Sequence, residues 1–406
     1  MSLPPKVAAV LEALEKAGHE AFIVGGCVRD MLLGKAPEDF DVATSAKPRH
    51  VKALFGRTVD TGIRHGTVTV LLGNETGRTD KTDKIEVTTY RVDGEYLDKR
   101  RPSWVGFTER IDEDLARRDF TMNAIAYNPK SGWRDPFGGR RDIGNRLIKC
   151  VGEPHERFSE DALRMVRAAR FAGQLGFAVD GGVMRGIAAM RENLGRVSIE
   201  RISDELRKLL LGEHAGALAI AHEAGLWPHI LRGGGIVQGG GADISAAAKS
   251  ISECARDFPM RLALLLGICA NPLEALKNLR LSRKTEKTAL AYLAHMRRPP
   301  AADKYEIKKL LASLPEGIFG GLLELWRVLL PGGVPERLWR AWREIEDGGE
   351  CYSLKTLAID GNRLLAMGAL QGRETGRVLA ELLDMVMREP GLNEETALME
   401  MAGRLL

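Results

Sequence analysis

The sequence predicts an α+β fold, in which a small head of alternating helices and strands is followed by an all-α body and tail. Helix and strand patterns alternate over residues 1–150, whereas from about residue 153 the strand patterns disappear and helical periodicity continues. At 406 residues and 44% apolar composition, the chain is long enough for roughly two to four domains with substantial cores.

The head is predicted to open with a helix, MSLPPKVAAVLEALEKAG, and to continue through a strand, a short helix and three further strands. The four strands are expected at AFIVGG (21–26), DFDVAT (39–44), TVTVLL (67–72) and KIEVTTYR (84–91), and the short helix at VRDMLLG (28–34). The intervening GNETGRTDKTD (73–83) is polar and rich in turn residues, so an extended hairpin loop is expected there.

The helical part begins with FSEDALRMVRAARFAGQLGF (158–177) and VSIERISDELRKLLLG (197–212). One face of the second segment collects the apolar residues Ile199, Ile202, Leu206, Leu209 and Leu210. The glycine-rich RGGGIVQGGGADIS (232–245) follows no strand and carries no GK[ST], so it is interpreted as a connection between helices rather than a phosphate loop. These features predict a head over 1–150, a neck over 151–232, a body over 233–350 and a tail over 351–406.

Composition and charge narrow the class of protein. No apolar stretch approaches the roughly 20 residues that span a bilayer, and no export signal is visible, which predicts a soluble, cytoplasmic chain with no membrane partner. Five cysteines form no CxxC and eight histidines have no zinc spacing, so no structural zinc is expected. The net charge of +4 conceals basic clusters, which permit a polyanionic partner: DKRRPSW, LARRDF and FGGRRDIGNR.

Two carboxylates one residue apart, Asp39 and Asp41, occupy the second predicted strand. On a strand both side chains point to one face, with Phe40 turned into the core. Because two like charges that close repel each other, the pair favours divalent cations, and Mg²⁺ held there can activate a hydroxyl and stabilise a leaving pyrophosphate. The alternative is an exposed polar edge strand.

A glycine turn precedes this pair. Gly25 and Gly26 allow backbone amides to approach a phosphate closely, and the helix that follows directs its positive end there, with Arg29 in the first turn. A phosphate cradle and a metal pair within twenty residues favour nucleotidyl transfer over the edge-strand interpretation.

This order of strand, GG turn, short helix and DxD strand resembles the polymerase-β-like nucleotidyltransferases. The sequence motif GGCVRDMLLG…DFDVAT is similar to that of the class II tRNA nucleotidyltransferase and bacterial poly(A) polymerase family. The similarity continues, in the family's order and spacing, through LARRDFTMNAIAY (115–127), DPFGGRRDI (135–143), EDALRMVRAARF (160–171) and ERISDELRKLL (200–210). This similarity covers about the first 230 residues strongly. The tail from LLAMGALQGRETGR onward is similar to the C-terminal helical domain of CCA-adding members. In the tail, Asn362 and Arg363 stand where the family pattern leads us to expect an acidic residue.

The resemblance implies roles for individual residues. The metal ligands fall on Asp39 and Asp41, and the phosphate contacts on Gly26, Arg29 and Arg118. Glu86 is a candidate third, catalytic carboxylate that could act as a base for the primer 3′ hydroxyl. The candidate nucleotide-binding residues of the helical part are Asp161, Arg164, Arg167 and Arg170. A surface strand glutamate is the alternative for Glu86.

The segment SEDALRMVR can also be analysed from its residues. Ser159 is a good N-cap, which would place Asp161 in the first helical turn, with Arg164 and Arg167 at following i+3 steps. An aspartate accepts hydrogen bonds and a guanidinium donates them, so an Asp161–Arg164 pair could admit cytosine and adenine while rejecting uracil and guanine. The alternative is an ion pair within the helix, which contributes little to stability when exposed.

The family resemblance implies an enzyme that adds C, C and A to the 3′ end of tRNA from CTP and ATP with Mg²⁺ and no template. The segment YRVDGEYLDKRRPSWVGFTERIDEDLARRDF, with Asp98, Arg100 and Pro102, is similar to the flexible loop of full CCA-adding enzymes. Three alternatives stay open: a poly(A) polymerase of the same family, an enzyme that adds only CC or only A, and a catalytically silent RNA-binding module.

Overall fold

The computed structural model describes residues 2–72, 84–94, 105–236, 241–368 and 372–406. The predicted hairpin loop at 73–83, the positions Asp98, Arg100 and Pro102, and part of the glycine-rich connection lie outside these ranges. The chain divides into two compact units, the first formed by Met1–Lys249 with Cys269–Arg280 and the second by Ser250–Ile268 with Leu281–Leu406. The four-part division expected from the sequence stays a prediction.

A seven-stranded mixed sheet organises the head, in the order β3-β4-β5-β2-β1-β8-β9. The only parallel pair in it joins β2 to β5, and the other neighbours are antiparallel. Its strands are β1 Ala21–Val24, β2 Asp41–Thr44, β3 Thr58–Gly62, β4 Thr67–Leu71, β5 Lys84–Thr89, β8 Ala126–Asn128 and β9 Gly132–Arg134. The four predicted strands are therefore present, and β3, β8 and β9 are additional.

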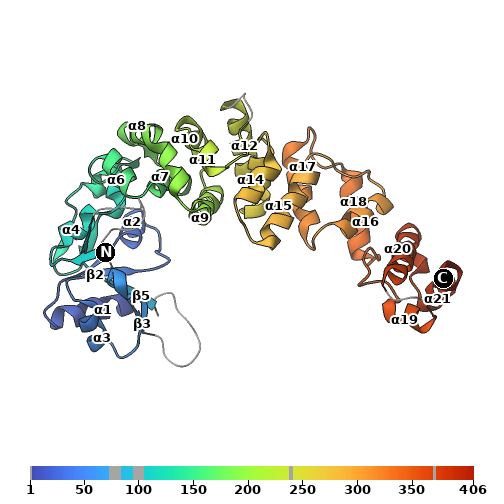
Figure 1. The fold of residues 1–406 in the computed structure, drawn as a ribbon, viewed down its shortest axis with the longest axis horizontal. Helices are drawn as coiled ribbons and strands as arrows, with labels where there is room; N and C mark the ends of the chain where they lie inside the picture. Colours follow the sequence, from blue (N-terminus) through green and yellow to red (C-terminus); the bar gives the residue numbers. More distant parts are fainter. Residues whose placement is uncertain (1, 73–83, 95–104, 237–240, 369–371) are drawn as a thin grey trace. The chain divides into compact units, whose positions relative to one another are not determined.

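Short helices pack around this sheet (Figure 1). They are α1 Pro5–Lys16, α2 Gly26–Leu32, α3 Pro48–Leu54, α4 Ile111–Ala116 and α5 Gly139–Gly144, with 3₁₀ turns at Ile63–His65 and Thr121–Asn123; β6 Arg91–Asp93 pairs with β7 Val105–Phe107. Phe22 and Val24 of β1, Leu115 of α4 and Tyr90 belong to one buried apolar cluster. This cluster fixes the central strands, and with them the segment that ends in Asp41.

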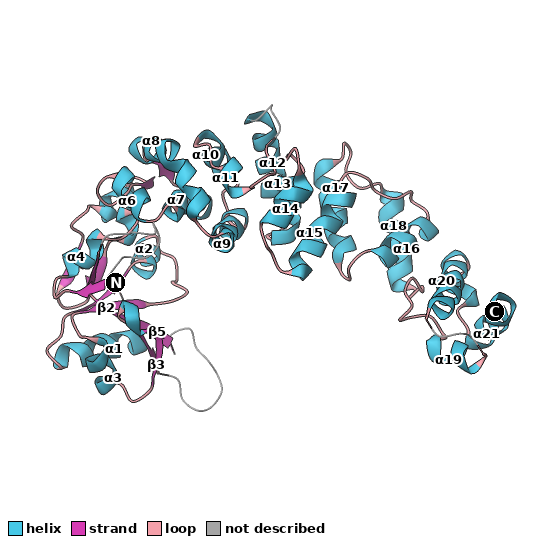
Figure 2. Ribbon diagram, viewed as in Figure 1, coloured by secondary structure: helices cyan, strands magenta, loops and turns pink. Residues whose placement is uncertain are grey.

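Helices follow the head within the first unit (Figure 2). They are α6 Pro154–Glu160, α7 Leu163–Leu175, α8 Gly181–Met190, α9 Ile199–Leu210, α10 Ala217–Glu223, α11 Trp227–Ile230 and α14 Pro272–Asn278, with α12 Gly241–Glu253 reaching the division between units and a 3₁₀ turn at Arg191–Arg196. The predicted apolar face of α9 is buried at all five positions. One detail differs from expectation, because β10 Leu147–Ile148 pairs with β11 Ala178–Val179 beyond residue 153.

The predicted N-cap at Ser159 is wrong. Ser159 lies inside α6, where its hydroxyl donates to the carbonyl of Glu156. The helix ends at Glu160, and Asp161 adopts an extended backbone with φ −144° and ψ 104° before α7 begins at Leu163. The Asp161 carboxylate accepts the Leu163 N–H at 3.1 Å, a local bond that competes with helix continuation and ends α6 here.

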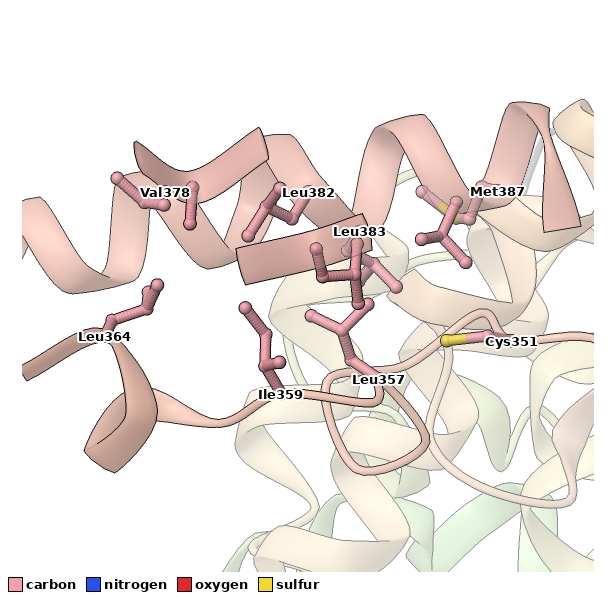
Figure 3. Close-up of a cluster of buried hydrophobic side chains, with 11 residues drawn as sticks. Cys351, Leu357, Ile359, Leu364, Val378, Leu382, Leu383 and Met387 are labelled. Atoms are coloured by element: carbon pink, nitrogen blue, oxygen red, sulfur yellow. The ribbon is translucent and has the colours of Figure 1, made fainter. Parts of the chain in front are cut away.

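The second unit is helical throughout its described residues. Its helices are α13 Phe258–Leu266, α15 Arg283–His295, α16 Lys304–Ser313, α17 Ile318–Leu329, α18 Glu336–Asp347, α19 Gly361–Ala366, α20 Arg373–Arg388 and α21 Glu395–Leu405, with a 3₁₀ turn at Pro390–Leu392. At the C-terminal end, Leu357, Ile359 and Leu364 point toward the apolar face of α20 (Figure 3). The tail thus has its own buried core, and the predicted α+β class with a helical body is confirmed.

Two further findings concern membrane-spanning helices and the state of the cysteines. In these ranges no helix has both the length and the apolar character needed to cross a membrane. All five cysteines are buried and free of disulfides.

Candidate active site

A cavity of about 710 Å³ in the first unit brings the predicted site residues together. Except for Glu86, every residue that the sequence assigned to the site lines it. The lining comprises Gly25, Gly26, Arg29, Asp39, Asp41, Arg117, Arg118, Asp119, Asn123, Asp161, Leu163, Arg164, Arg167, Arg170, Phe171, Arg201 and Lys208. Segments from α2 to α9 therefore converge on one hollow, although they are spread over more than 180 residues of sequence.

The two carboxylates of the DxD motif do not share a strand as expected. β2 begins at Asp41, so Asp39 lies in the preceding connection, while Phe40 between them is buried as predicted. Asp41 stands opposite Glu86 in the parallel pairing of β2 with β5, which places Glu86 on the neighbouring strand as expected. Glu86 is exposed and does not line the cavity, so its catalytic role stays a prediction.

Asp41 is exposed at the cavity, yet the neighbouring protein groups disfavour its charged form. Desolvation by the surrounding protein raises the pKa of Asp41 from 3.8 to about 6, and the charges of Glu86 and Asp39 act in the same direction. The nearby Arg118 lowers the pKa and only partly offsets these effects. An additional positive charge at this position would stabilise the carboxylate.

This shift predicts a pH-dependent effect of Asp41→Asn on the metal-free protein. Because the folded-state pKa lies above the unfolded value, ionisation of Asp41 makes folding less favourable as pH rises from about 4 through 6. We expect Asp41→Asn to raise the melting temperature at pH 8, and the gain to shrink as pH falls below 6. Thermal denaturation in chelator measures it, and the exposed Asp347→Asn serves as control. An equal gain at all pH values would contradict the prediction.

Gly25 is the residue that allows the turn before α2. Its φ of 76° and ψ of −132° belong to a region that only glycine adopts readily. A Cβ at this position would lie 2.9 Å from an Arg118 guanidinium nitrogen and 3.9 Å from an Asp41 carboxylate oxygen. Gly25 therefore permits the side chains of Arg118 and Asp41 to approach the same turn. Gly26 has no positive φ, and its nearest neighbour would be Arg29 at an ordinary 3.7 Å.

We predict that Gly25→Ala destabilises the protein by about 1–3 kcal/mol, because the new side chain strains the backbone and displaces Arg118. Gly26→Ala is the matched control for folding, since it adds the same methyl group one residue later without strain. Chemical denaturation of both variants measures the difference. Equal stability of the two variants would show that the turn does not depend on Gly25.

The head supplies two arginines whose orientations are defined by neighbouring groups. The Arg29 guanidinium donates to Asp30 at 2.7 and 2.9 Å and to the Asn123 side-chain oxygen at 2.9 Å. Arg118 donates to the Asn123 carbonyl and to Asp114, both at 3.3 Å. These bonds hold both cations at the cavity wall on either side of the glycine turn.

Asp161 and Arg164 do not pair with each other. Asp161 instead pairs with Arg201 of α9 at 2.7 Å. Arg164 is buried, pairs with Glu160 and donates to the Arg117 carbonyl at 2.9 Å. The alternative of an ion pair between Asp161 and Arg164 within one helix is therefore wrong, because the break after Glu160 turns Asp161 toward α9. Both residues still line the cavity.

Two buried carboxylates hold the other neck arginines. Arg167 pairs with Asp119 at 2.6 Å, and Arg170 pairs with Glu205 of α9 at 2.6 Å. Burial would raise the pKa of Asp119, but the charge of Arg167 and the hydrogen bond from Asn123 hold it below its usual range. Asp119 therefore stays ionised and links the head to α7. Arg170 is buried.

The lining of the cavity is rich in basic side chains, and four carboxylates outside the lining pair with several of them: Asp30, Asp114, Glu160 and Glu205. Eight basic side chains line the cavity, Arg29, Arg117, Arg118, Arg164, Arg167, Arg170, Arg201 and Lys208, against four acidic ones, Asp39, Asp41, Asp119 and Asp161. Clefts lined by one sign of charge attract ligands of the opposite sign. A nucleoside triphosphate carries the opposite charge to these basic side chains.

Sequence reasoning did not assign several residues of this cavity. Arg117, Asp119 and Asn123 stand in the quoted RRDFTMN motif beside Arg118, so their position in that motif is a signal that could have identified them. Arg201 and Lys208 belong to the quoted ERISDELRKLL segment, which carried no site assignment. Their contribution depends on the packing of α9 against α7, which local sequence does not specify.

The carboxylates present fit a divalent cation. Oxygen ligands are those that Mg²⁺ prefers, and the exposed residues Asp39 and Asp41 both line the cavity. Among the described residues, no group of three or more His, Cys, Asp or Glu side chains is arranged to hold a metal ion. The Asp39 and Asp41 pair would therefore need a further oxygen donor, which a bound triphosphate offers.

Comparison with known proteins agrees with this geometry. Residues 21–149 match a family described as the poly(A) polymerase head domain, and residues 176–234 match one described as a probable RNA- and SrmB-binding site of polymerase A. The CCA-adding enzyme of Leuconostoc citreum is 36% identical over 405 residues, which cover 98% of this chain and 95% of that protein.

Two solved structures share the fold. The crystal structure of the Bacillus stearothermophilus CCA-adding enzyme in complex with CTP has a TM-score of 0.80 at 29% identity, covering 99% of this chain and 98% of that one. The Thermotoga maritima CCA-adding enzyme complexed with tRNA has a TM-score of 0.64 at 19% identity, covering 100% and 97%, and this likeness concerns the fold. The chain therefore belongs to the CCA-adding enzymes, nucleotidyltransferases of the tRNA nucleotidyltransferase and poly(A) polymerase family.

Proposed function

We propose that this enzyme adds C, C and A to the 3′ end of tRNA from CTP and ATP, releases pyrophosphate and uses no nucleic-acid template. The observation that carries the proposal is an arginine-rich cavity in which a DxD carboxylate pair, a glycine turn and the Asp161–Arg164 segment meet. Relatives that align with nearly the whole chain are named CCA-adding enzymes, which supports this choice over a poly(A) polymerase. Because the substrate is tRNA, we place the activity in the cytoplasm.

The residues divide the work by their chemistry. Arg29 and Arg118, beside Gly26, would hold the triphosphate, because guanidinium groups match phosphate oxygens in geometry and charge. Arg167 and Arg170 would support the nucleotide from the neck. Mg²⁺ bound by Asp39 and Asp41 would supply positive charge near the reacting phosphate and lower the pKa of the primer hydroxyl. Glu86 is the proposed base for that hydroxyl.

Nucleotide selection is assigned to the neck. The Asp161 carboxylate accepts hydrogen bonds, and Arg164 donates them. Cytosine and adenine each present an exocyclic amine beside an unprotonated ring nitrogen, so the two side chains would match both bases. Their contacts with Arg201 and Glu160 hold them at the cavity wall before a base enters. A protein surface would therefore replace the template strand.

The proposal is tested with purified full-length protein and tRNA lacking its 3′ CCA. Each labelled nucleoside triphosphate is supplied separately and then together, with Mg²⁺, and product length is read on a gel. We expect two additions with CTP alone and three with CTP and ATP. A long adenylate ladder with ATP alone would identify a poly(A) polymerase, and arrest after CC or failure to add C would identify a partial enzyme. No extension of any RNA would overturn the proposal.

The affinity for tRNA should depend strongly on salt, because basic faces of the helical body are proposed to contact phosphates of the acceptor arm. Each neutralised phosphate releases condensed counterions, so log Kd should rise linearly with log salt. Filter binding between low and moderate salt, with CTP absent, measures the slope. A flat dependence would indicate that the natural substrate is not a nucleic acid. The proposed four-part organisation assigns this contact to the body and to the tail over 351–406.

A further inference from the structure

One aromatic ring contacts three of the arginines at the cavity. The guanidinium carbon of Arg170 lies 3.7 Å from the centroid of the Phe171 ring, that of Arg29 lies 5.3 Å away and that of Arg167 lies 5.4 Å away. Phe171 is 3% exposed and lines the cavity from α7. Three cations therefore surround one buried ring.

The three arginines come from two different parts of the first unit. Arg29 belongs to α2 of the head, whereas Arg167 and Arg170 belong to α7. Each also has a carboxylate partner, and these partners are different: Asp30, Asp119 and Glu205. Phe171 is therefore a group that the head arginine and both neck arginines contact together.

The arrangement has a physical rationale. Guanidinium groups gathered around one ring repel one another, and the side chains of Arg29 and Arg170 are only 12% and 10% exposed, so water compensates little. The negative face of an aromatic ring attracts cations, and this attraction strengthens when both groups are desolvated. Burial lowers the pKa of Arg170 to about 10, and the charges of Arg167 and Arg29 add to that effect although Glu205 opposes it. The ring thus offsets part of the repulsion among the three cations.

We propose that Phe171 is a positioning residue that holds Arg29 of the head and Arg167 and Arg170 of the neck in one arrangement before the nucleotide binds. The inference rests on the proposed function, because the anion that the cluster receives is the triphosphate of CTP or ATP. Phe171 itself is almost inaccessible and acts through the arginines. Since all three cations are displaced together when the ring is removed, the loss should be the same for both nucleotides.

The test substitutes Phe171 with leucine, which keeps an apolar side chain but removes the π-system. We expect the Kd for CTP and the Kd for ATP to rise by the same factor, about tenfold. Calorimetry on the full chain with Mg²⁺ and no tRNA measures both constants. In the addition assay, KM for both nucleotides should rise while kcat at saturation changes little. Arg29→Ala is combined with Phe171→Leu, because a ring that acts through Arg29 must lose part of its effect when that cation is absent.

A matched variant distinguishes the positioning role of Phe171 from a purely structural role. Phe171 also packs edge-on against Phe120, with centroids 5.7 Å apart, so Phe171→Leu will lower the melting temperature in any case. Phe158→Leu removes another fully buried phenylalanine of the first unit, on α6, and should lower stability without changing the Kd for either nucleotide.

The outcomes distinguish a failure of the positioning role of Phe171 from a failure of the proposed function. If the wild-type chain binds CTP and ATP but Phe171→Leu binds them equally well, the positioning role is wrong and the proposed function stands. Full additivity of Phe171→Leu with Arg29→Ala would also overturn the positioning role. If the wild-type chain binds neither nucleotide and extends no RNA, the proposed function falls and the positioning role falls with it.

Discussion

Replacing Asp41 with alanine is expected to abolish nucleotide addition while tRNA binding largely survives. The physical reason is that Asp41 lies at the start of β2, beside Asp39, where its carboxylate is proposed to hold the divalent cation at the reacting phosphate. Binding of tRNA depends on phosphate contacts spread over the helical parts and should not require this carboxylate. Single-turnover extension of tRNA lacking CCA, together with filter binding of the same variant, measures both quantities.

The matched variants for this result are Asp39→Ala and Asp60→Ala. Asp39→Ala should also be inactive, although Asp39 lies outside the strand. Asp60 is a half-exposed aspartate of β3 in the same sheet, paired with Lys52, and its loss should leave addition unchanged. Activity near the wild-type level in Asp41→Ala would exclude the metal-pair assignment.

Replacing Asp161 with alanine is expected to relax nucleotide selection. Loss of the acceptor for the exocyclic amine should cost about 1–3 kcal/mol, or roughly tenfold or more in selectivity, so that UTP or GTP is incorporated at a larger fraction of the CTP rate. The measurement is the ratio of kcat/KM for each of the four nucleotides on the same tRNA. This ratio cancels changes that affect all nucleotides equally.

The pairing of Asp161 with Arg201 requires a second variant. Asp161→Ala leaves the Arg201 guanidinium without its 2.7 Å partner, so part of any loss could come from Arg201. Arg201→Ala keeps the carboxylate and removes the cation, and should retain more selectivity than Asp161→Ala. Equal loss of activity for every nucleotide in Asp161→Ala, or full selectivity, would show that Asp161 has a structural role and that the base is read elsewhere.

Much of the head could be predicted from sequence because its signals are local. Alternating apolar residues predict β4 and β5, and the glycine pair before VRDMLLG predicts the turn that leads into α2. Strands β8 and β9 were missed because each has only three residues, too few for an alternating pattern to emerge. Their presence is decided by pairing along β1 and with each other, which occurs only after the chain has folded.

The sequence by itself determined the class of chemistry, since the DxD pair, the glycine turn and the arginine-rich segments are present whatever their final partners. The tertiary structure decided which charges that are distant in sequence meet. Asp161 and Arg201 are 40 residues apart, and Arg167 and Asp119 are 48 apart. A charge in the sequence has several possible partners of opposite sign, and electrostatic attraction depends on distance in space. The packing of α7 against α9 and the head therefore selects these long-range pairs of the cavity.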